Sequence, residues 1–145
     1  SNWRTNEDDR LMIQRPYEKL LVWQQAHALC LKIYRLTKTF PQDERWRLVD
    51  QMSRAAESIP ANIVEANGRR SGGDKRRFFN IAVASLEELH YHTMLARDLQ
   101  YITLEQFAEI DSETRSISYL LGRIRTASFT KYPSNASKSS HASNS

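Results

Sequence analysis

Apolar side chains recur at spacings of three and four along four stretches of the chain, and none of these stretches alternates with the period of two expected of a β-strand. The stretches span residues 17–39 and 43–66, and two more begin after residue 71 and at residue 103. Each carries an apolar face as wide as that of a helix packed in a bundle. Helices joined by short connections pack as antiparallel neighbours. The pattern therefore predicts an all-α fold, an up-down-up-down antiparallel four-helix bundle.

Two of the predicted helices begin with a capping box, in which two side chains three residues apart satisfy backbone N–H groups. Ser71 and Asp74 have this spacing at the start of the third helix. Thr103 and Gln106 have it at the start of the fourth helix. The connections before these helices are therefore expected to be short.

The second predicted helix contains Pro60, which removes one backbone hydrogen bond and clashes with the preceding turn. The apolar register continues past Pro60, so we expect one kinked helix instead of two. Small residues around it (Ala55, Ala56 and Ala61) allow neighbouring helices to approach closely. Asn62 is expected to bond either the carbonyl freed by Pro60 or a group on the adjacent helix. We also expect interhelical ion pairs among charged residues of this region, Arg54, Glu57, Glu65 and Glu88.

The two ends of the chain differ from its centre. Residues 1–15 are polar and charged, and we interpret them as a flexible arm. Residues 131–145 are rich in serine and asparagine and offer too little apolar surface to offset the entropy of ordering, so a disordered tail is expected. The bundle is predicted as one domain, residues 16–130.

The 145-residue chain has a net charge of +4 and a single cysteine, Cys30. One cysteine forms no intramolecular disulfide, which favours a reducing, cytoplasmic location. No stretch approaches the roughly 18 consecutive apolar residues of a membrane span, and the first residues lack the apolar segment of a signal peptide. Cys30 lies on the apolar row of the first helix, where burial makes a thiol inert. His27, on the same row, is expected in the core or at an interface.

The one hint of a metal site is the Glu-x-x-His spacing of Glu87 and His90 on the third helix. A di-iron site in a four-helix bundle needs this motif on two helices and a carboxylate from each of the others. His27, His92 and His141 have no glutamate three residues before them, so the motif is not repeated. The sequence therefore predicts no catalytic residue, no metal and no cofactor.

Positive charge is concentrated around the connection between the second and third predicted helices. Within nine positions, where Asp74 is the one acidic residue, the chain carries Arg69, Arg70, Lys75, Arg76 and Arg77. A helix N-terminus adds unpaired N–H groups that favour an anion, and arginine binds phosphate with two hydrogen bonds. We interpret this cluster as a contact for RNA or DNA that reads charge and shape instead of base sequence. The alternatives are charge for solubility, or ion pairs with another subunit.

Other charged and aromatic residues are placed away from this cluster. Arg123, Arg125 and Lys131 on the fourth helix are expected toward the other end of the bundle, and they are not included in the cluster. Phe78 and Phe79 are expected in the core, so no aromatic residue is predicted to stack a base beside the arginines.

Several aromatic residues lie off the main apolar rows, namely Trp46, Tyr91, Tyr101 and Tyr119. Large aromatic side chains outside a core often mark an interface. We therefore expect the protein to form a homo-oligomer.

The run from Arg54 to Ile63, Arg-Ala-Ala-Glu-Ser-Ile-Pro-Ala-Asn-Ile, is a specific marker. It resembles the 23S rRNA intervening sequence family of four-helix bundle proteins, as do the segments Val22-Trp23-Gln24-Gln25-Ala26 and Ser85-Leu86-Glu87-Glu88-Leu89. Members of that family are encoded in insertions within bacterial large-subunit rRNA genes. The resemblance covers about residues 17–127 and implies a homopentamer without known enzyme activity.

A related family, the accessory variability determinant of diversity-generating retroelements, also looks similar. That resemblance implies binding of nucleic acid and of a reverse transcriptase through a basic surface. Two hypotheses follow. The favoured one is a non-enzymatic, oligomeric adaptor that binds structured RNA or a nucleic-acid-handling protein. The alternative is a protein-binding scaffold that makes no contact with nucleic acid.

Overall fold

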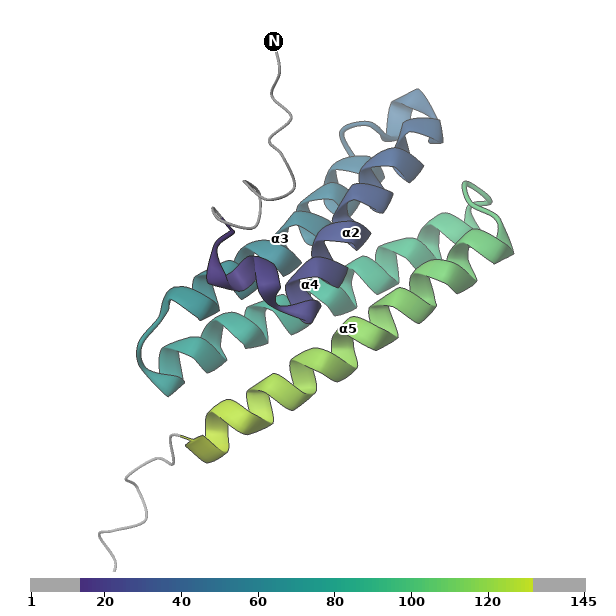
Figure 1. Cartoon of the computed structure of the whole chain (residues 1–145). Coiled ribbons are helices and arrows are strands. Elements are labelled where there is room, and N and C mark those ends of the chain that lie inside the picture. Colours follow the sequence, from purple (N-terminus) through teal and green to yellow (C-terminus); the bar gives the residue numbers. More distant parts are fainter. Residues whose placement is uncertain (1–13, 132–145) are drawn as a thin grey trace, which may run out of the picture.

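The computed structural model describes residues 14–131, with side chains described as far as residue 127. This part of the chain contains four long helices and no strand, which confirms the predicted all-α fold. The helices are α2 (Leu21–Leu36), α3 (Leu48–Gly68), α4 (Gly72–Asp98) and α5 (Leu104–Lys131) (Figure 1). The predicted arm and tail lie outside the described residues, except for residues 14, 15 and 131.

Each helix packs against its neighbour in the chain, and α2 also contacts α5, which closes the ring of four. The α4–α5 pair illustrates the direction of packing: His90 bonds Asp111 at 2.8 Å, and Asn80 bonds Arg125 at 2.9 Å. The α5 residue with the higher number is bonded to the α4 residue with the lower number, so the two helices are antiparallel. Figure 1 shows the α2–α3 and α4–α5 connections at one end of the bundle, and the α3–α4 connection with the C-terminal turns of α5 at the other. The predicted up-down-up-down topology is confirmed.

Short 3-10 turns shorten two of the predicted helices. The first predicted helix, residues 17–39, is divided into η1 (Pro16–Lys19), α2 and η2 (Thr37–Thr39). Leu20 separates η1 from α2 because its backbone is extended, with ψ at 124°. The second helix begins at Leu48, later than the predicted residue 43, because residues 42–44 form a separate turn, η3 (Gln42–Glu44).

The core consists of apolar side chains from all four helices, and α3 and α4 share its most extensive contact. Met52, Ile59 and Ile63 of α3 and Leu89 of α4 have no exposed surface. Burying side chains of this size contributes about 1.5–3 kcal/mol each. Pro60 is also buried, and α3 continues through it, which confirms the prediction of a single helix.

A short polar network links α3 to α4 beside Pro60. Asn62 donates from Nδ2 to the carbonyl of Ser58 (2.7 Å) and to its hydroxyl (3.0 Å), and that hydroxyl bonds Ser85 of α4 at 2.7 Å. The freed carbonyl four residues before Pro60 is that of Ala56, and both bonds of Asn62 go to Ser58 on its own helix, so these bonds match neither of the two predicted roles of Asn62. Its side chain instead braces the serine pair that joins the two helices.

Arg54, Glu57, Glu65 and Glu88 make no interhelical ion pair among the described contacts, which corrects that prediction; Glu57 instead accepts a hydrogen bond from the Tyr34 hydroxyl of α2. Arg54 pairs with Asp50, and Glu65 pairs with Arg69, each at 3.1 Å and four residues apart. Long side chains on an exposed helix surface reach the next turn of the same helix more easily than the next helix. Glu88 likewise bonds within α4, to His92 at 3.3 Å.

The interhelical ion pairs of the described residues lie instead at the two seams of α5. At the α2–α5 seam, Lys32 bonds both Glu109 and Glu113. Burial lowers the pKa of Lys32, but hydrogen bonds to the two carboxylates outweigh this effect and raise the pKa overall. Gln25 and Ser116 bond at 2.8 Å on the same seam. Polar groups therefore line the outside of this seam, next to the buried apolar residues of both helices.

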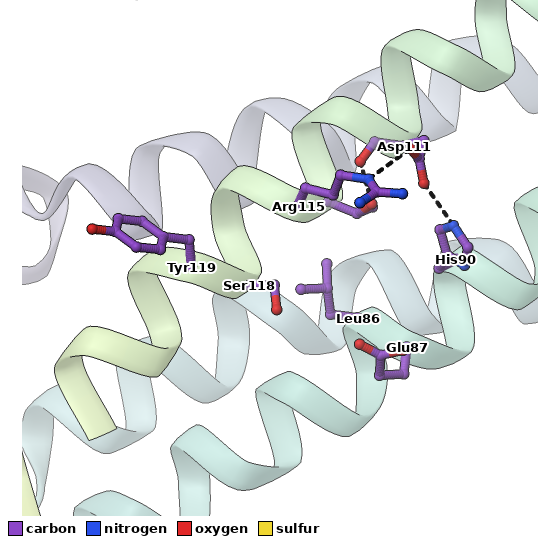
Figure 2. A pocket seen from close by; sticks show the side chains of 8 residues that line it. Leu86, Glu87, His90, Asp111, Arg115, Ser118 and Tyr119 are labelled. Carbon is purple, nitrogen blue, oxygen red and sulfur yellow. Dashed lines mark hydrogen bonds and ion pairs between the residues drawn. The ribbon is translucent and has the colours of Figure 1, made fainter. Parts of the chain in front are cut away.

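At the α4–α5 seam, Asp111 accepts from Arg115 at 2.9 Å on its own helix and bonds His90 of α4 at 2.8 Å (Figure 2). The hydrogen bonds from Arg115 and then from His90 hold the pKa of Asp111 below its usual range, although burial acts in the opposite direction. The second histidine nitrogen and the remaining guanidinium N–H groups stay available to other partners. His90, part of the Glu-x-x-His spacing, thus serves the α4–α5 contact.

Two residues of the predicted apolar rows lie at the surface. His27, expected in the core or at an interface, is exposed and stacks on Trp23 with ring centroids 4.9 Å apart. Tyr34 is 43 % exposed. Both side chains lie on a part of the α2 surface that is exposed to solvent. Cys30, between them on the same row, is buried as predicted.

The α4–α5 connection contains a left-handed residue, Gln100, with φ at 64°. The N–H of Tyr101 donates to the carbonyl of Ala96, and the N–H of Gln100 donates to that of Arg97, both at 2.9 Å. This is the Schellman arrangement, in which glycine is the usual left-handed residue because a Cβ is strained there.

Replacing Gln100 with glycine is therefore expected to stabilise the fold by about 0.5–1 kcal/mol, since relief of strain exceeds the added entropy of the unfolded chain. Urea unfolding measures the change. Gln51→Gly, at an exposed position within α3, is the matched control, and its free energy of unfolding is expected to fall by about 1 kcal/mol. Equal losses at both positions would contradict the assignment of strain to Gln100.

The lowered pKa of Asp111 predicts a pH-dependent contribution to stability. A carboxyl whose pKa is depressed on folding stabilises the fold above its unfolded pKa, about 3.9, and loses this contribution as the pH falls through the folded value. The free energy of unfolding of Asp111→Asn is therefore expected to fall below that of the natural protein at pH 5 and to converge with it near pH 2. Urea titrations across this range measure the difference, and Arg115→Gln is expected to reduce it in part. A difference independent of pH would rule out this role.

Candidate nucleic-acid interface

The α3–α4 connection presents the predicted basic residues at one end of the bundle. α3 ends at Gly68. Arg69 follows with an extended backbone, and Arg70 belongs to the connection to α4. α4 begins at Gly72, with the Ser71 hydroxyl accepting from the Asp74 N–H at 3.1 Å, as the sequence predicted. Lys75, Arg76 and Arg77 lie in the first turns of α4. The cap thus fixes the point at which the chain reverses and the basic residues gather.

Backbone groups at this end favour an anion at α4 and a cation at α3. The first four N–H groups of α4 have no partner within the helix, and Ser71 satisfies that of Asp74. The last carbonyls of α3 carry the opposite partial charge. Lys75 donates to one of them, that of Ala66, at 3.4 Å. One basic side chain therefore compensates the C-terminus of α3, while the N-terminus of α4 adds to the positive field.

Phe78, expected in the core, is half-buried at its edge, where it packs against the core and also contacts two arginines. The guanidinium carbons of Arg69 and Arg77 lie 4.6 and 4.8 Å from the centre of its ring. Arg69 also pairs with Glu65 at 3.1 Å. Contact with an aromatic face attracts the cations and limits their motion, which lowers the entropy cost of binding a ligand. Phe79, the next residue, is buried as predicted.

The expectation that Arg123 and Arg125 lie toward the other end of the bundle is wrong. Because α4 and α5 are antiparallel, the last turns of α5 lie beside the first turns of α4. Arg125 accordingly donates to the side-chain oxygen of Asn80 at 2.9 Å. The side chain of Lys131, placed with these arginines in the prediction, lies outside the described residues. The topology predicted from the sequence already implied this position, since helix direction reverses at every connection.

The α3–α4 connection, α4 and α5 therefore contribute to one basic surface, which we call the basic end. It comprises Arg69, Arg70, Lys75, Arg76, Arg77, Arg123 and Arg125. Within residues 65–77 and 119–127 the acidic residues are Glu65 and Asp74, and the first of these is paired with Arg69. Basic residues therefore outnumber acidic ones in these two segments, which suits a polyanion.

The described residues offer little for catalysis. Among residues 14–131, no three His, Cys, Asp or Glu side chains are placed to hold a metal ion. Cys30 is buried, and burial, followed by the nearby charge of Glu57, raises the pKa of its thiol. A thiol with a raised pKa is mostly protonated and is a weak nucleophile. None of the helices in this part of the chain has the length and apolarity needed to cross a membrane.

The aromatic residues off the main rows are mostly exposed. Trp46 is 77 % exposed, Tyr119 65 % and Tyr91 57 %. Tyr101 differs, because its ring packs on Phe40 and its hydroxyl donates to Glu44 at 3.1 Å. Tyr101 therefore joins the two connections at the far end of the bundle, and the other three remain free to contact a partner.

Comparison with known proteins gives three findings. Among solved structures, a protein of unknown function from the S23 ribosomal protein family of Bacteroides thetaiotaomicron VPI-5482 is similar, with a TM-score of 0.68 and 29% sequence identity. The match covers 73% of this chain and 96% of that one. No curated protein sequence matches significantly. The family described as 23S rRNA-intervening sequence protein matches residues 18–123, most of the bundle. The chain belongs to the 23S rRNA-intervening sequence protein family.

Proposed function

We propose that this protein is a non-enzymatic, oligomeric adaptor whose basic end binds the phosphate backbone of structured RNA. The observation that carries the proposal is the gathering of basic side chains from the α3–α4 connection, α4 and α5 at one end of the bundle, with Glu65 and Asp74 as the nearby acids. RNA is favoured over DNA because the family is described by its link to 23S rRNA-intervening sequences. Binding of a nucleic-acid-handling protein, such as a reverse transcriptase, through the same surface belongs to this proposal as a second class of partner.

The contact is proposed to recognise charge and shape. Guanidinium groups held against Phe78 present hydrogen-bond donors to phosphate oxygens, and phosphate contacts position a protein without reading the base sequence. Most of the affinity is then expected to come from released counterions.

Neutralising part of the basic end is expected to weaken RNA binding. The variant Arg69→Gln, Arg70→Gln, Arg77→Gln removes three positive charges, and its Kd for an RNA hairpin is expected to rise at least about ten-fold at 50 mM salt. The slope of log K against log salt is expected to become shallower by about 2–3, since each neutralised phosphate contributes about 0.7–0.9. Fluorescence anisotropy over a salt series measures both quantities.

The matched control removes the same charge from the other end of the bundle. Lys38→Gln, Arg45→Gln, Arg47→Gln changes exposed residues of the α2–α3 connection, and it is expected to leave the slope unchanged. Equal effects of the two triple variants would mean that net charge, not the basic end, governs binding. No RNA binding at low salt, together with a changed oligomer mass in the first variant, would favour the protein-binding scaffold.

The oligomer is proposed to form through an exposed apolar row on α4. Ile81 is 41 % exposed and Tyr91 57 % exposed, and the exposed Ala84 lies between them at helical spacing. The resemblance described above makes a homopentamer the expected assembly. Light scattering on the natural protein is expected to give about five times the 16.9 kDa chain mass. Ile81→Glu, Tyr91→Glu is expected to reduce this value toward that of one chain, and an unchanged mass would place the interface elsewhere.

A further inference from the structure

A shallow groove runs along the α4–α5 seam toward the basic end. Its first part, about 390 Å³, is bounded by the His90–Asp111 pair at one end and Tyr119 at the other (Figure 2). Ser118 and Tyr119 also line a second hollow of about 610 Å³, which continues along the last described turns of α5. The second hollow is lined by α5 residues alone, and it adjoins the first at Ser118 and Tyr119. We call the two hollows together the α5 groove.

The positive charge of the α5 groove is concentrated in its second part, which Arg123 and Arg125 line without an acidic residue. In the first part, Arg115 pairs with Asp111, which also bonds His90, and Glu87 is a further acid on the α4 wall. The hydrogen bonds to Asp111 and Asn80 fix Arg115 and Arg125 while each guanidinium keeps further N–H donors for a ligand. The groove therefore offers positioned donors to successive phosphates.

An aromatic ring lies between these arginines. Tyr119 is 65 % exposed, and the guanidinium of Arg123 lies 5.9 Å from the centre of its ring. Gly122, three residues further along α5, has no atom within 4 Å of the position a Cβ would occupy. The ring therefore has open space beside it on the groove side. Exposed aromatic rings among arginines are the usual platform for unpaired bases, because every base has a face that stacks.

We infer that the α5 groove binds an unpaired RNA segment that continues from a duplex held at the basic end, with one base stacked on Tyr119 and phosphates on Arg123 and Arg125. This inference rests on the proposed function, since the duplex brings the segment to the groove. Arg115 and Arg125 lie ten positions apart, about 15 Å along the helix, which is room for a few nucleotides. The partner of the whole protein is then a junction between paired and unpaired RNA.

The test compares a blunt RNA hairpin with the same hairpin carrying a four-nucleotide unpaired extension, placed at either the 5′ or the 3′ end. The natural protein is expected to bind one of the extended hairpins about five-fold or more tightly than the blunt one, as anisotropy measures. Tyr119→Ala is expected to remove this advantage and leave the affinity for the blunt hairpin unchanged. Tyr119→Trp, which retains a stacking ring, is expected to keep it.

Two further variants separate the groove from general effects. Gly122→Leu retains every charge and fills the open space beside Tyr119, so it is expected to abolish the advantage of the extension. Trp46→Ala removes an exposed aromatic residue from the α2–α3 connection and is expected to change nothing. Circular dichroism of each variant confirms that the bundle is folded.

The outcomes distinguish this inference from the proposed function. If the blunt hairpin binds through the basic end but the extension adds nothing, or if Tyr119→Ala keeps the advantage, the groove inference is wrong and the proposed function stands. If neither hairpin binds at low salt, both are wrong. If Tyr119→Ala instead lowers the oligomer mass, the ring is a subunit contact and the groove does not take RNA.

Discussion

The antiparallel packing of successive helices through their apolar faces determines where every other group of this protein lies. The fully buried side chains of α3 and α4, such as Ile59, Ile63 and Leu89, make the most extensive of these contacts. α2 and α5 pack on either side and meet along a smaller seam. Because direction reverses at each connection, the start of α4 shares one end of the bundle with the last turns of α5. The basic end is a consequence of this arrangement.

Polar interactions then fix how the seams are aligned. The seam between α3 and α4 carries the Ser58–Ser85 bond, and the seam between α4 and α5 carries the His90–Asp111 pair. Their net contributions to stability are small beside the buried apolar surface. They matter more for geometry, since a hydrogen bond between two particular groups fixes the axial position of one helix relative to the next.

The same contacts prepare the surface that we propose for RNA. Arg69 and Arg77 rest on Phe78, and Arg115 and Arg125 are held by Asp111 and Asn80. An arginine that is positioned before binding loses less rotamer entropy when it meets a phosphate. The basic end and the α5 groove thus share one feature. In both, a neutral or acidic neighbour positions an arginine side chain, and some of its N–H groups remain available to a phosphate.

The sequence by itself determined the four helices, the Ser71 cap, the Thr103–Gln106 capping box, the continuity of α3 through Pro60 and the position of the basic residues near the α3–α4 connection. These features depend on residues within about four positions of each other, the range over which helix periodicity and caps act. The tertiary structure alone decided that Phe78 supports arginines, and that Arg125 reaches Asn80, 45 positions away in the chain. It also decided the hollow beside Tyr119. Such placements depend on the direction and rotation of each helix against its neighbours, and no local pattern encodes these.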